Sequence, residues 1–188
     1  LGSAGFTIDG NFVPGTCFGI YANSSALSAL TFTSTAGVGK FSFKNYGYFI
    51  ADGSGPMTVN VATETTLALS QNSFCQKQAR SWGAMTTNIN GTLTLSGESY
   101  FQNGGGGPMI TTIFSNGTLI LSNGSAFSHY GTNMNTNVYG TMTLSSASGV
   151  VNYGADMTTT VHNGGPPRRL FPLLAPPRTT LAPSPGTM

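Results

Sequence analysis

The residues that could perform acid–base chemistry are few in this sequence. Only five acidic residues and two histidines occur among 188 positions, and the acidic ones are Asp9, Asp52, Glu64, Glu98 and Asp156. Glycoside hydrolysis needs two carboxylates on either side of one bond, yet these residues recur at no fixed interval. The glycine run 104–107 is followed by Pro108, without the lysine of a phosphate loop. We therefore predict that the chain is not an enzyme and that it binds no cofactor or metal.

The charge balance also excludes classes of partner. Charged residues make up 6% of the chain and the net charge is +2, whereas nucleic acid is bound by clustered lysines and arginines. No apolar run approaches the roughly 18 residues that span a bilayer. Aromatic residues at 11% and apolar residues at 39% are more than a disordered chain carries. We expect a folded domain with no nucleic-acid partner and no transmembrane segment.

An imperfect repeat dominates the middle of the chain. One segment reads Gly91-Thr92-Leu93-Thr94-Leu95 and returns at Gly117 and Gly140, with a copy at Thr65 and a weaker one predicted at Ala29. A second segment begins with methionine and recurs at Met57, Met85, Met109, Met134 and Met157. A third is predicted to begin at Phe43, Phe74, Phe101, Phe127 and Val150. Apolar and polar residues alternate within the first two segments, as in half-buried strands.

Three strands per repeat predict the fold class. We expect an all-β protein, a three-sided parallel β-helix (β-solenoid) of about five coils with roughly 25 residues per coil. The predicted regions are a cap at 1–26, the solenoid at 27–163 and a Pro-rich tail or linker at 164–188, because Pro166 and Pro167 cannot continue a ladder. A sandwich of antiparallel strands is the alternative, but it does not explain why the segments recur in one fixed order.

The alternation predicts which side chains face inward. Leucines and methionines should form the core columns, together with the column that runs from Val61 to Val161. Thr87, Thr111, Thr136 and Thr159 share the inward direction, so their hydroxyls should bond to each other or to backbone. At one corner we predict an inward ladder of Asn45, Asn103, His129 and Asn152, in which His129 is structural rather than catalytic.

The outward positions of the Gly-Thr-Leu segments form two predicted columns, rich in threonine. Their threonines are Thr66, Thr92, Thr94, Thr118, Thr141 and Thr143. Paired outward threonine columns on a flat sheet resemble those of ice-binding solenoids, which would imply binding to ice, although Ala68 and Ile120 interrupt the pattern here. The alternative is that threonine is simply a favourable residue on an exposed strand.

A second candidate surface is the corner that precedes each methionine segment. Measured from the predicted third segment, this connection shortens steadily along the chain, and insertions in repeat proteins often mark a binding face. We predict a glycan or receptor contact there, formed by Tyr46, Tyr48, Phe49, Lys77, Arg80 and Trp82. The alternative is that these aromatic residues pack onto the first coils as a lid.

Two kinds of modification can be read from the sequence. Candidate N-glycosylation sites are Asn23, Asn90, Asn116 and Asn123, although Asn-Gly is also a common turn pair. Cys17 and Cys75 could form one disulfide in an oxidising compartment or remain two buried thiols.

The Gly-Thr-Leu-Thr-Leu strands resemble those of repetitive β-helix surface proteins, such as adhesins and haemagglutinin-like passenger domains. The resemblance covers about residues 27–163 and is one of fold. It implies a secreted or cell-surface structural or adhesive protein. The partners that we consider are glycans, a surface receptor, ice and other copies of the same chain.

Overall fold

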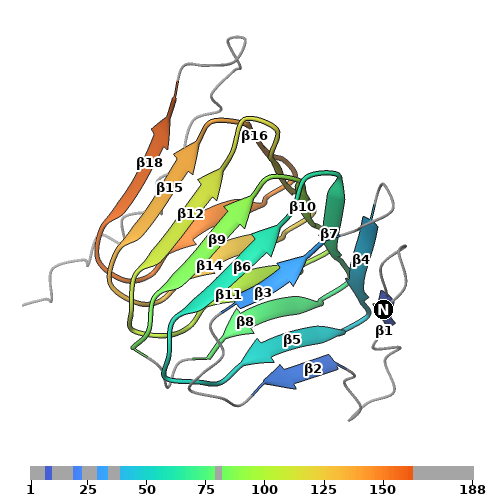
Figure 1. The fold of residues 1–188 in the computed structure, drawn as a ribbon, viewed down its shortest axis with the longest axis horizontal. Coiled ribbons are helices and arrows are strands. Elements are labelled where there is room, and N and C mark those ends of the chain that lie inside the picture. Colours follow the sequence, from blue (N-terminus) through green and yellow to red (C-terminus); the bar gives the residue numbers. More distant parts are fainter. Residues whose placement is uncertain (1–6, 10–18, 23–28, 34–38, 79–81, 163–188) are drawn as a thin grey trace, which may run out of the picture.

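The computed structural model describes residues 7–9, 19–22, 29–33, 39–78 and 82–162, which form three parallel sheets around one core (Figure 1). The first sheet contains β1 (Thr7–Asp9), β4 (Gly39–Lys44), β7 (Thr65–Leu69), β10 (Thr92–Leu95), β13 (Thr118–Leu121) and β16 (Thr141–Leu144). The second contains β2 (Gly19–Ala22), β5 (Tyr48–Ala51), β8 (Phe74–Lys77), β11 (Tyr100–Asn103), β14 (Ala126–His129) and β17 (Gly149–Asn152). The third contains β3 (Ala29–Phe32), β6 (Met57–Val61), β9 (Met85–Ile89), β12 (Met109–Ile113), β15 (Met134–Val138) and β18 (Met157–Val161).

Each coil visits the three sheets in turn, so every strand pairs with the third strand after it. The result is a β-solenoid of about five turns with about 26 residues per coil, which confirms the predicted fold class. Strands β1 and β2 lie within residues 1–26 and pair with β4 and β5, so the sheets begin before the predicted boundary at residue 27. The predicted tail, 164–188, lies outside the described residues.

Identical side chains stack on one another because the coils are in register. Leu67 pairs with Leu93 and Leu93 with Leu119, and the methionine that begins each strand from β6 to β18 in the third sheet occupies one column. Along β7 buried positions alternate with half-buried ones, as the pleat requires. Phe101 and Phe127 stack inside with ring centroids 5.0 Å apart. Burying each such side chain stabilises the fold by about 2 kcal/mol.

The corner between the first and second sheets is held by one serine in each of four successive coils, which is buried in three coils and half-buried in the last. After β10, the hydroxyl of Ser99 donates to the Leu69 carbonyl at 3.0 Å, and the Ser96 N–H donates to the Ser99 hydroxyl at 2.9 Å. The same two bonds are made by the other serines at this position, Ser73, Ser125 and Ser148. The spacing Ser-x-x-Ser therefore marks this corner in the sequence as well as in the structure.

The two residues between the serines adopt left-handed backbone conformations. Their φ angles are 59° and 60° at Gly97 and Glu98, and 52° and 60° at Ser146 and Ala147. Two consecutive positive φ values make a tight turn of the I′ type, which favours Gly and Asn. The turn after β13, Asn123-Gly124, has that preferred composition.

The predicted register was wrong in the first coils. Ala29–Phe32 pairs with β6 in the third sheet rather than joining the first. Phe43 pairs with Leu69 in the first sheet, and the second sheet aligns Phe49, Cys75, Phe101, Phe127 and Val150. Aromatic residues replace leucine in β4, so the sequence pattern no longer distinguished the segments. The connections to the third sheet also do not shorten steadily, because 78–84 is longer than the earlier 52–56.

The inward threonines also differ from expectation. Thr87, Thr111 and Thr136 are buried as predicted, but none of their hydroxyls has a hydrogen-bond partner. Thr159 is only half-buried, on β18.

We predict that Thr111→Val stabilises the protein by about 1 kcal/mol, because it replaces an unsatisfied buried hydroxyl by a methyl group of similar shape. Val59 already occupies this column one rung before Thr87, so valine fits the site. Urea unfolding of both forms measures the change. The reverse change, Val59→Thr, should destabilise. A destabilised Thr111→Val variant would show that the hydroxyl has a partner.

Candidate functional site

The outer side of the first sheet carries the two predicted threonine columns in register. Thr66, Thr92, Thr118 and Thr141 pair on successive rungs, and the neighbouring column is Ala68, Thr94, Ile120 and Thr143. These eight residues define the threonine face. Rungs lie about 4.8 Å apart and the columns about 6.6 Å apart, since they are two residues apart on one strand. The face is thus a regular array of hydroxyl and methyl groups.

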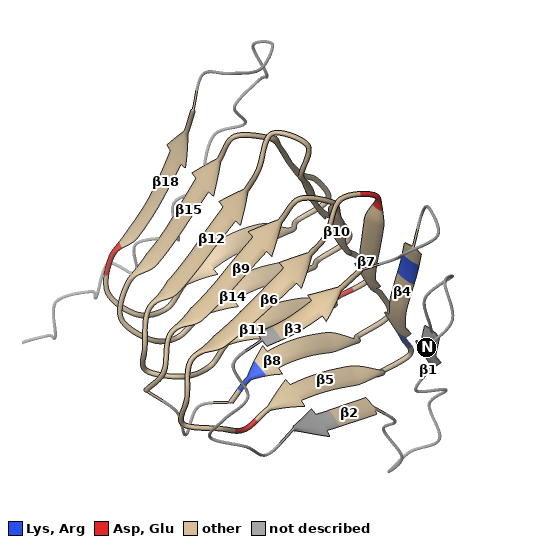
Figure 2. Ribbon diagram, viewed as in Figure 1, with Lys and Arg blue, Asp and Glu red and all other residues tan. Residues whose placement is uncertain are grey.

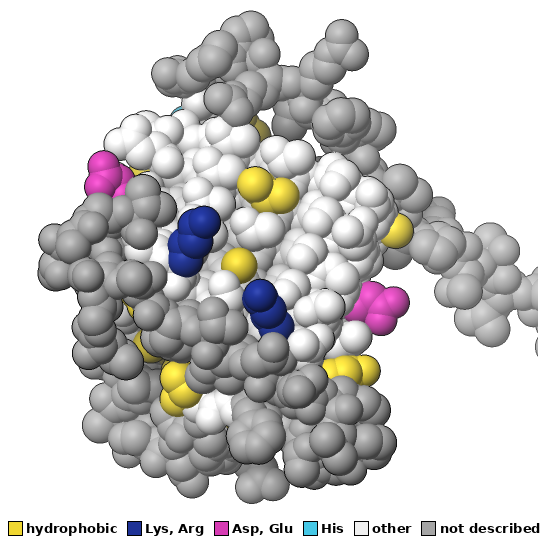
Figure 3. Space-filling view, turned by 90° about the vertical axis from the view of Figure 1, so that its right-hand side faces the viewer, with side chains coloured by type: hydrophobic (Ala, Val, Ile, Leu, Met, Phe, Trp, Pro, Cys, Tyr) yellow, Lys and Arg dark blue, Asp and Glu magenta, His cyan; other side chains and the backbone are white. Residues whose placement is uncertain are grey.

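The hydroxyls of the threonine face are not engaged by the part of the chain that the structure describes. None of its six threonines forms a side-chain hydrogen bond to another residue that the structure describes. Figure 3 shows the described part of this side as mostly uncharged, with basic side chains near its middle, acidic ones at its edges and scattered hydrophobic ones. The lysines of β4 are Lys40, which continues the Thr66 column by one rung, and Lys44.

The outer side of the third sheet differs in this respect. The Asn88 amide donates to the Asn60 side chain at 2.9 Å, and the Asn60 amide donates to Thr31 at 3.2 Å. These amides therefore satisfy one another along the column, and less of their hydrogen-bonding capacity remains for a partner.

The structure separates the residues predicted to form the glycan contact. Tyr46 lies in the turn after β4 with φ 66°. Tyr48 faces outward on β5 and stacks on Phe74 at 5.5 Å, whereas Phe49 is part of the core. The prediction treated all three as one loop because the register in this coil was wrong.

The remaining residues of that prediction also lie apart. Lys77 points inward on β8 and is 1% exposed, with its Nζ donating to the Gly53 carbonyl at 3.1 Å. Burial lowers the pKa of Lys77, and the negative charge of Asp52 partly opposes this. Arg80 lies outside the described residues. Trp82 is 82% exposed at the corner between the second and third sheets, so it is the one of the six that remains a candidate contact.

Two stacks of aromatic rings were not predicted. Tyr48, Phe74 and Tyr100 form a column on the outer side of the second sheet, with 4.8 Å between the Phe74 and Tyr100 centroids. Tyr130 and Tyr153 stack at 4.5 Å one corner further along. Rings stacked along the solenoid axis cover one another's faces, so a ligand meets ring faces only at the ends of each stack.

The predicted inward polar ladder is present, but Lys77 rather than Asn45 forms its first rung. The column runs from Lys77 through Asn103 and His129 to Asn152, and Asn45 lies in a turn instead. The Asn103 amide donates to the Gly107 carbonyl at 3.2 Å and accepts from the Gly105 N–H at 3.0 Å. Asn152 makes the equivalent bonds to Asp156 and Gly154. Each asparagine thus closes its own corner.

His129 does not satisfy both of its ring nitrogens at this position. Nδ1 lies 3.3 Å from the Asn103 carbonyl and 3.4 Å from the Gly131 nitrogen, while the buried Nε2 has no partner. Burial lowers the pKa of His129, and the hydrogen bond to the Asn103 backbone opposes this only in part. The ring is therefore held neutral and serves the corner structurally.

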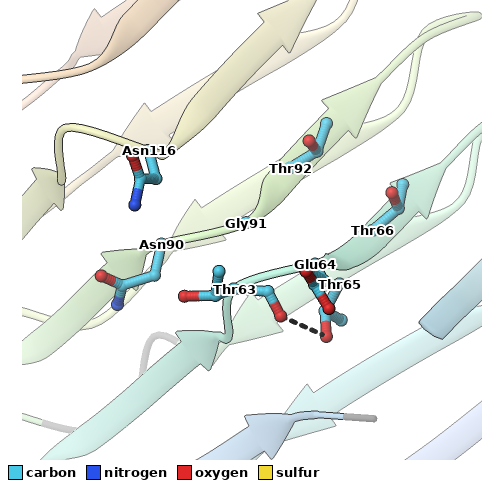
Figure 4. A pocket seen from close by; sticks show the side chains of 8 residues that line it. All are labelled: Thr63, Glu64, Thr65, Thr66, Asn90, Gly91, Thr92 and Asn116. Atoms are coloured by element: carbon cyan, nitrogen blue, oxygen red, sulfur yellow. Dashed lines mark hydrogen bonds between the residues drawn. The ribbon is translucent and has the colours of Figure 1, made fainter. Parts of the chain in front are cut away.

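A shallow hollow lies where the third sheet turns into the first (Figure 4). Its volume is about 320 Å³, and it is lined by Thr63, Glu64, Thr65, Thr66, Asn90, Gly91, Thr92 and Asn116. In Figure 4, Thr66 and Thr92 project side by side from successive strands beside it. Among the described residues that line the hollow, Glu64 is the one carboxylate, whereas glycoside hydrolysis uses a pair.

Charges are sparse on the ribbon and lie mostly near strand ends and corners (Figure 2). Among the described residues, no group of three or more His, Cys, Asp or Glu side chains could hold a metal ion. The same part of the chain contains no helix with the length and hydropathy needed to cross a membrane.

The sites of predicted modification are placed as follows. Asn116 and Asn123 are exposed and Asn90 is half-buried, all at corners, while Asn23 lies outside the described residues. Their glycosylation stays a prediction. Cys75 is a free, buried thiol whose pKa is raised by burial, so it is unreactive in the fold. Cys17 lies outside the described residues.

Comparisons with known proteins return no match: no family model, no curated protein and no solved structure is similar to this chain.

We predict that His129→Asn removes a pH dependence of stability. The ordinary histidine pKa is 6.5 and the pKa of His129 in the folded chain is lower, so below pH 6.5 the unfolded chain takes up a proton that the folded chain resists. The free energy of unfolding of the wild type should therefore fall as the pH drops from 8 to 5, and most of the loss should occur below pH 6.5.

Asparagine already fits the neighbouring rungs at Asn103 and Asn152, so the variant should fold and show a flatter profile. Chemical denaturation at pH 8, 6.5 and 5 measures this. Equal slopes in the wild type and His129→Asn would contradict the assignment.

Proposed function

We propose that the protein is a non-enzymatic structural or adhesive β-solenoid of a cell surface or extracellular space, with the threonine face as its contact surface. The observation that carries the proposal is the set of free hydroxyls on the described threonine face, repeated on four successive rungs. A rigid sheet presents these groups with little ordering cost on binding, because hydrogen-bonded strands already fix their spacing.

Repetition suits an extended partner better than a small ligand. Each rung offers a weak contact, and a partner that spans several rungs adds these contacts within one binding event. The low charge of the face makes such contacts insensitive to salt. The fold-level resemblance to repetitive β-helix surface proteins supports the same assignment, with a glycan-coated surface, a surface receptor or a second copy as the partner.

Adsorption to surfaces tests the proposal. The full chain is passed over sensors coated with mucin, and the adsorbed mass is compared with that of Thr92→Tyr/Thr118→Tyr. Bulky rings should break the flat array and remove most of the adsorption. The matched control, Thr86→Tyr/Thr112→Tyr, changes the outer side of the third sheet and should adsorb like the wild type. Equal loss in both variants, or turnover of a polysaccharide by the pure protein, would overturn the proposal.

Ice is the second candidate partner of the same face. The specific observation in its favour is the uninterrupted column from Thr66 to Thr141, which repeats at the rung spacing of about 4.8 Å. Thermal hysteresis measured with the same variants tests ice binding. If the face binds ice, the wild type shows thermal hysteresis and Thr92→Tyr/Thr118→Tyr loses it. No hysteresis in the wild type would remove this candidate.

A further inference from the structure

The corner between the second and third sheets displays the most exposed large aromatic side chain among the described residues. Trp82 is 82% exposed and lies in the longest of the connections between these sheets, 78–84. A solvated indole at this level is unusual, because tryptophan normally buries most of its area. No described part of the chain packs over the Trp82 side chain to shield it from solvent.

Trp82 is nevertheless held in place from below. A Cβ built on Gly106 would come within 2.6 Å of the indole Cε3, so the ring lies directly against the backbone of the next rung. The carbonyl of Trp82 packs equally closely on Gly107. A side chain at Gly106 would therefore displace the ring, and the indole presents its other face to solvent.

The rung after these glycines brings the other exposed rings. His129 pairs with Asn103. The next residues of the two strands, Tyr130 and Gly104, therefore lie one above the other. Gly131 packs on the carbonyls of Gly105 and Gly107. Tyr130 and Tyr153 are 52% and 62% exposed and stack at 4.5 Å. Gly104 contributes no side chain beneath Tyr130, whose hydroxyl bonds to the side chains of Tyr153 and Gln102. We name this region, comprising Trp82, the glycine run 104–107, Tyr130 and Tyr153, the Trp82 corner.

The chemistry of the Trp82 corner selects a class of ligand. An exposed aromatic face binds a flat apolar surface, and nearby backbone groups bind hydroxyls. The nearest described cation, Lys77, is buried and bonded to Gly53, so an acidic ligand finds no exposed charge among the described residues there. The rings are separated by a glycine floor rather than merged into one apolar patch, which disfavours a protein interface. Sugar rings have the required apolar faces and hydroxyl edges.

We propose that the Trp82 corner binds a neutral oligosaccharide, with one sugar ring stacked on Trp82 and the chain running past Gly104 toward Tyr130. Two rungs separate the rings, about 10 Å along the axis, so more than one sugar unit is engaged. This surface is distinct from the threonine face, and the inference stands or falls independently of the proposed function.

The chain provides its own probe, because Trp82 is its only tryptophan. The full chain is titrated with cellohexaose, chitohexaose and mannohexaose while the tryptophan emission is recorded. At least one should give a saturable blue shift as the indole leaves water. Calorimetry with the same sugar should show that Trp82→Ala binds about ten-fold more weakly or worse, as truncation of an aromatic anchor does. Because the side chain is exposed, this variant keeps the fold.

Two further variants separate the site from a general effect. Gly106→Val displaces the indole without removing it and should weaken binding, while Tyr139→Ala removes a ring stacked on His162 at a different corner and should bind like the wild type. Adsorption through the threonine face should be unchanged in Trp82→Ala. A flat titration with all three sugars, or wild-type affinity in Trp82→Ala, would overturn the inference.

Discussion

The in-register stacking of one coil on the next is the constraint on which every other feature of this protein depends. At the end of each first-sheet strand from β7 to β13, one carbonyl of the coil below accepts two bonds from the coil above. Leu95, for example, accepts from the Ser122 N–H at 3.0 Å and from the Ser125 hydroxyl at 3.0 Å. A slip of one residue would break both bonds and turn the whole strand inside out. The serine corner thus fixes which side chains are core and which are surface.

The same constraint divides the molecule into parts that stabilise and parts that remain free to bind. Inward columns are filled by leucine, methionine and phenylalanine or by polar groups that close corners, as Asn103 does. Amides on the outer third sheet bond to each other. The threonines of the threonine face make no such bond to another described residue, and Trp82 is 82% exposed. The threonine face and the Trp82 corner are the two surfaces to which we assign binding. Low charge and sparse titratable groups agree with recognition by shape and hydroxyl contacts.

Much of the fold could be predicted because stacking leaves its period in the sequence. Five methionine segments and the Gly-Thr-Leu copies predicted the coil length, the core columns and the threonine face by alternation alone. The prediction of the register failed in the first coils because Phe41 and Phe43 occupy positions that later coils fill with leucine. The sequence of this segment therefore fitted two registers. The prediction for the threonine hydroxyls failed for a different reason. Alternation shows that Thr111 points inward, but whether its hydroxyl finds a partner depends on neighbours from other strands.

The Trp82 corner was predicted only in part, because Trp82 was grouped with Phe49 and Lys77, which point inward. Its exposure depends on Gly106, one coil further along the chain, and alternation within a strand carries no information on such contacts.

Hydrogen-bond couplings across the coils test the stacking most directly. Long-range NMR couplings between a backbone nitrogen and the carbonyl carbon that it bonds identify each donor and acceptor. In-register stacking predicts couplings from Ser96 to Leu69, from Ser122 to Leu95 and from Ser145 to Leu121, the same step on three successive rungs. Couplings that instead pair neighbouring strands of one repeat, as in antiparallel hairpins, would contradict it.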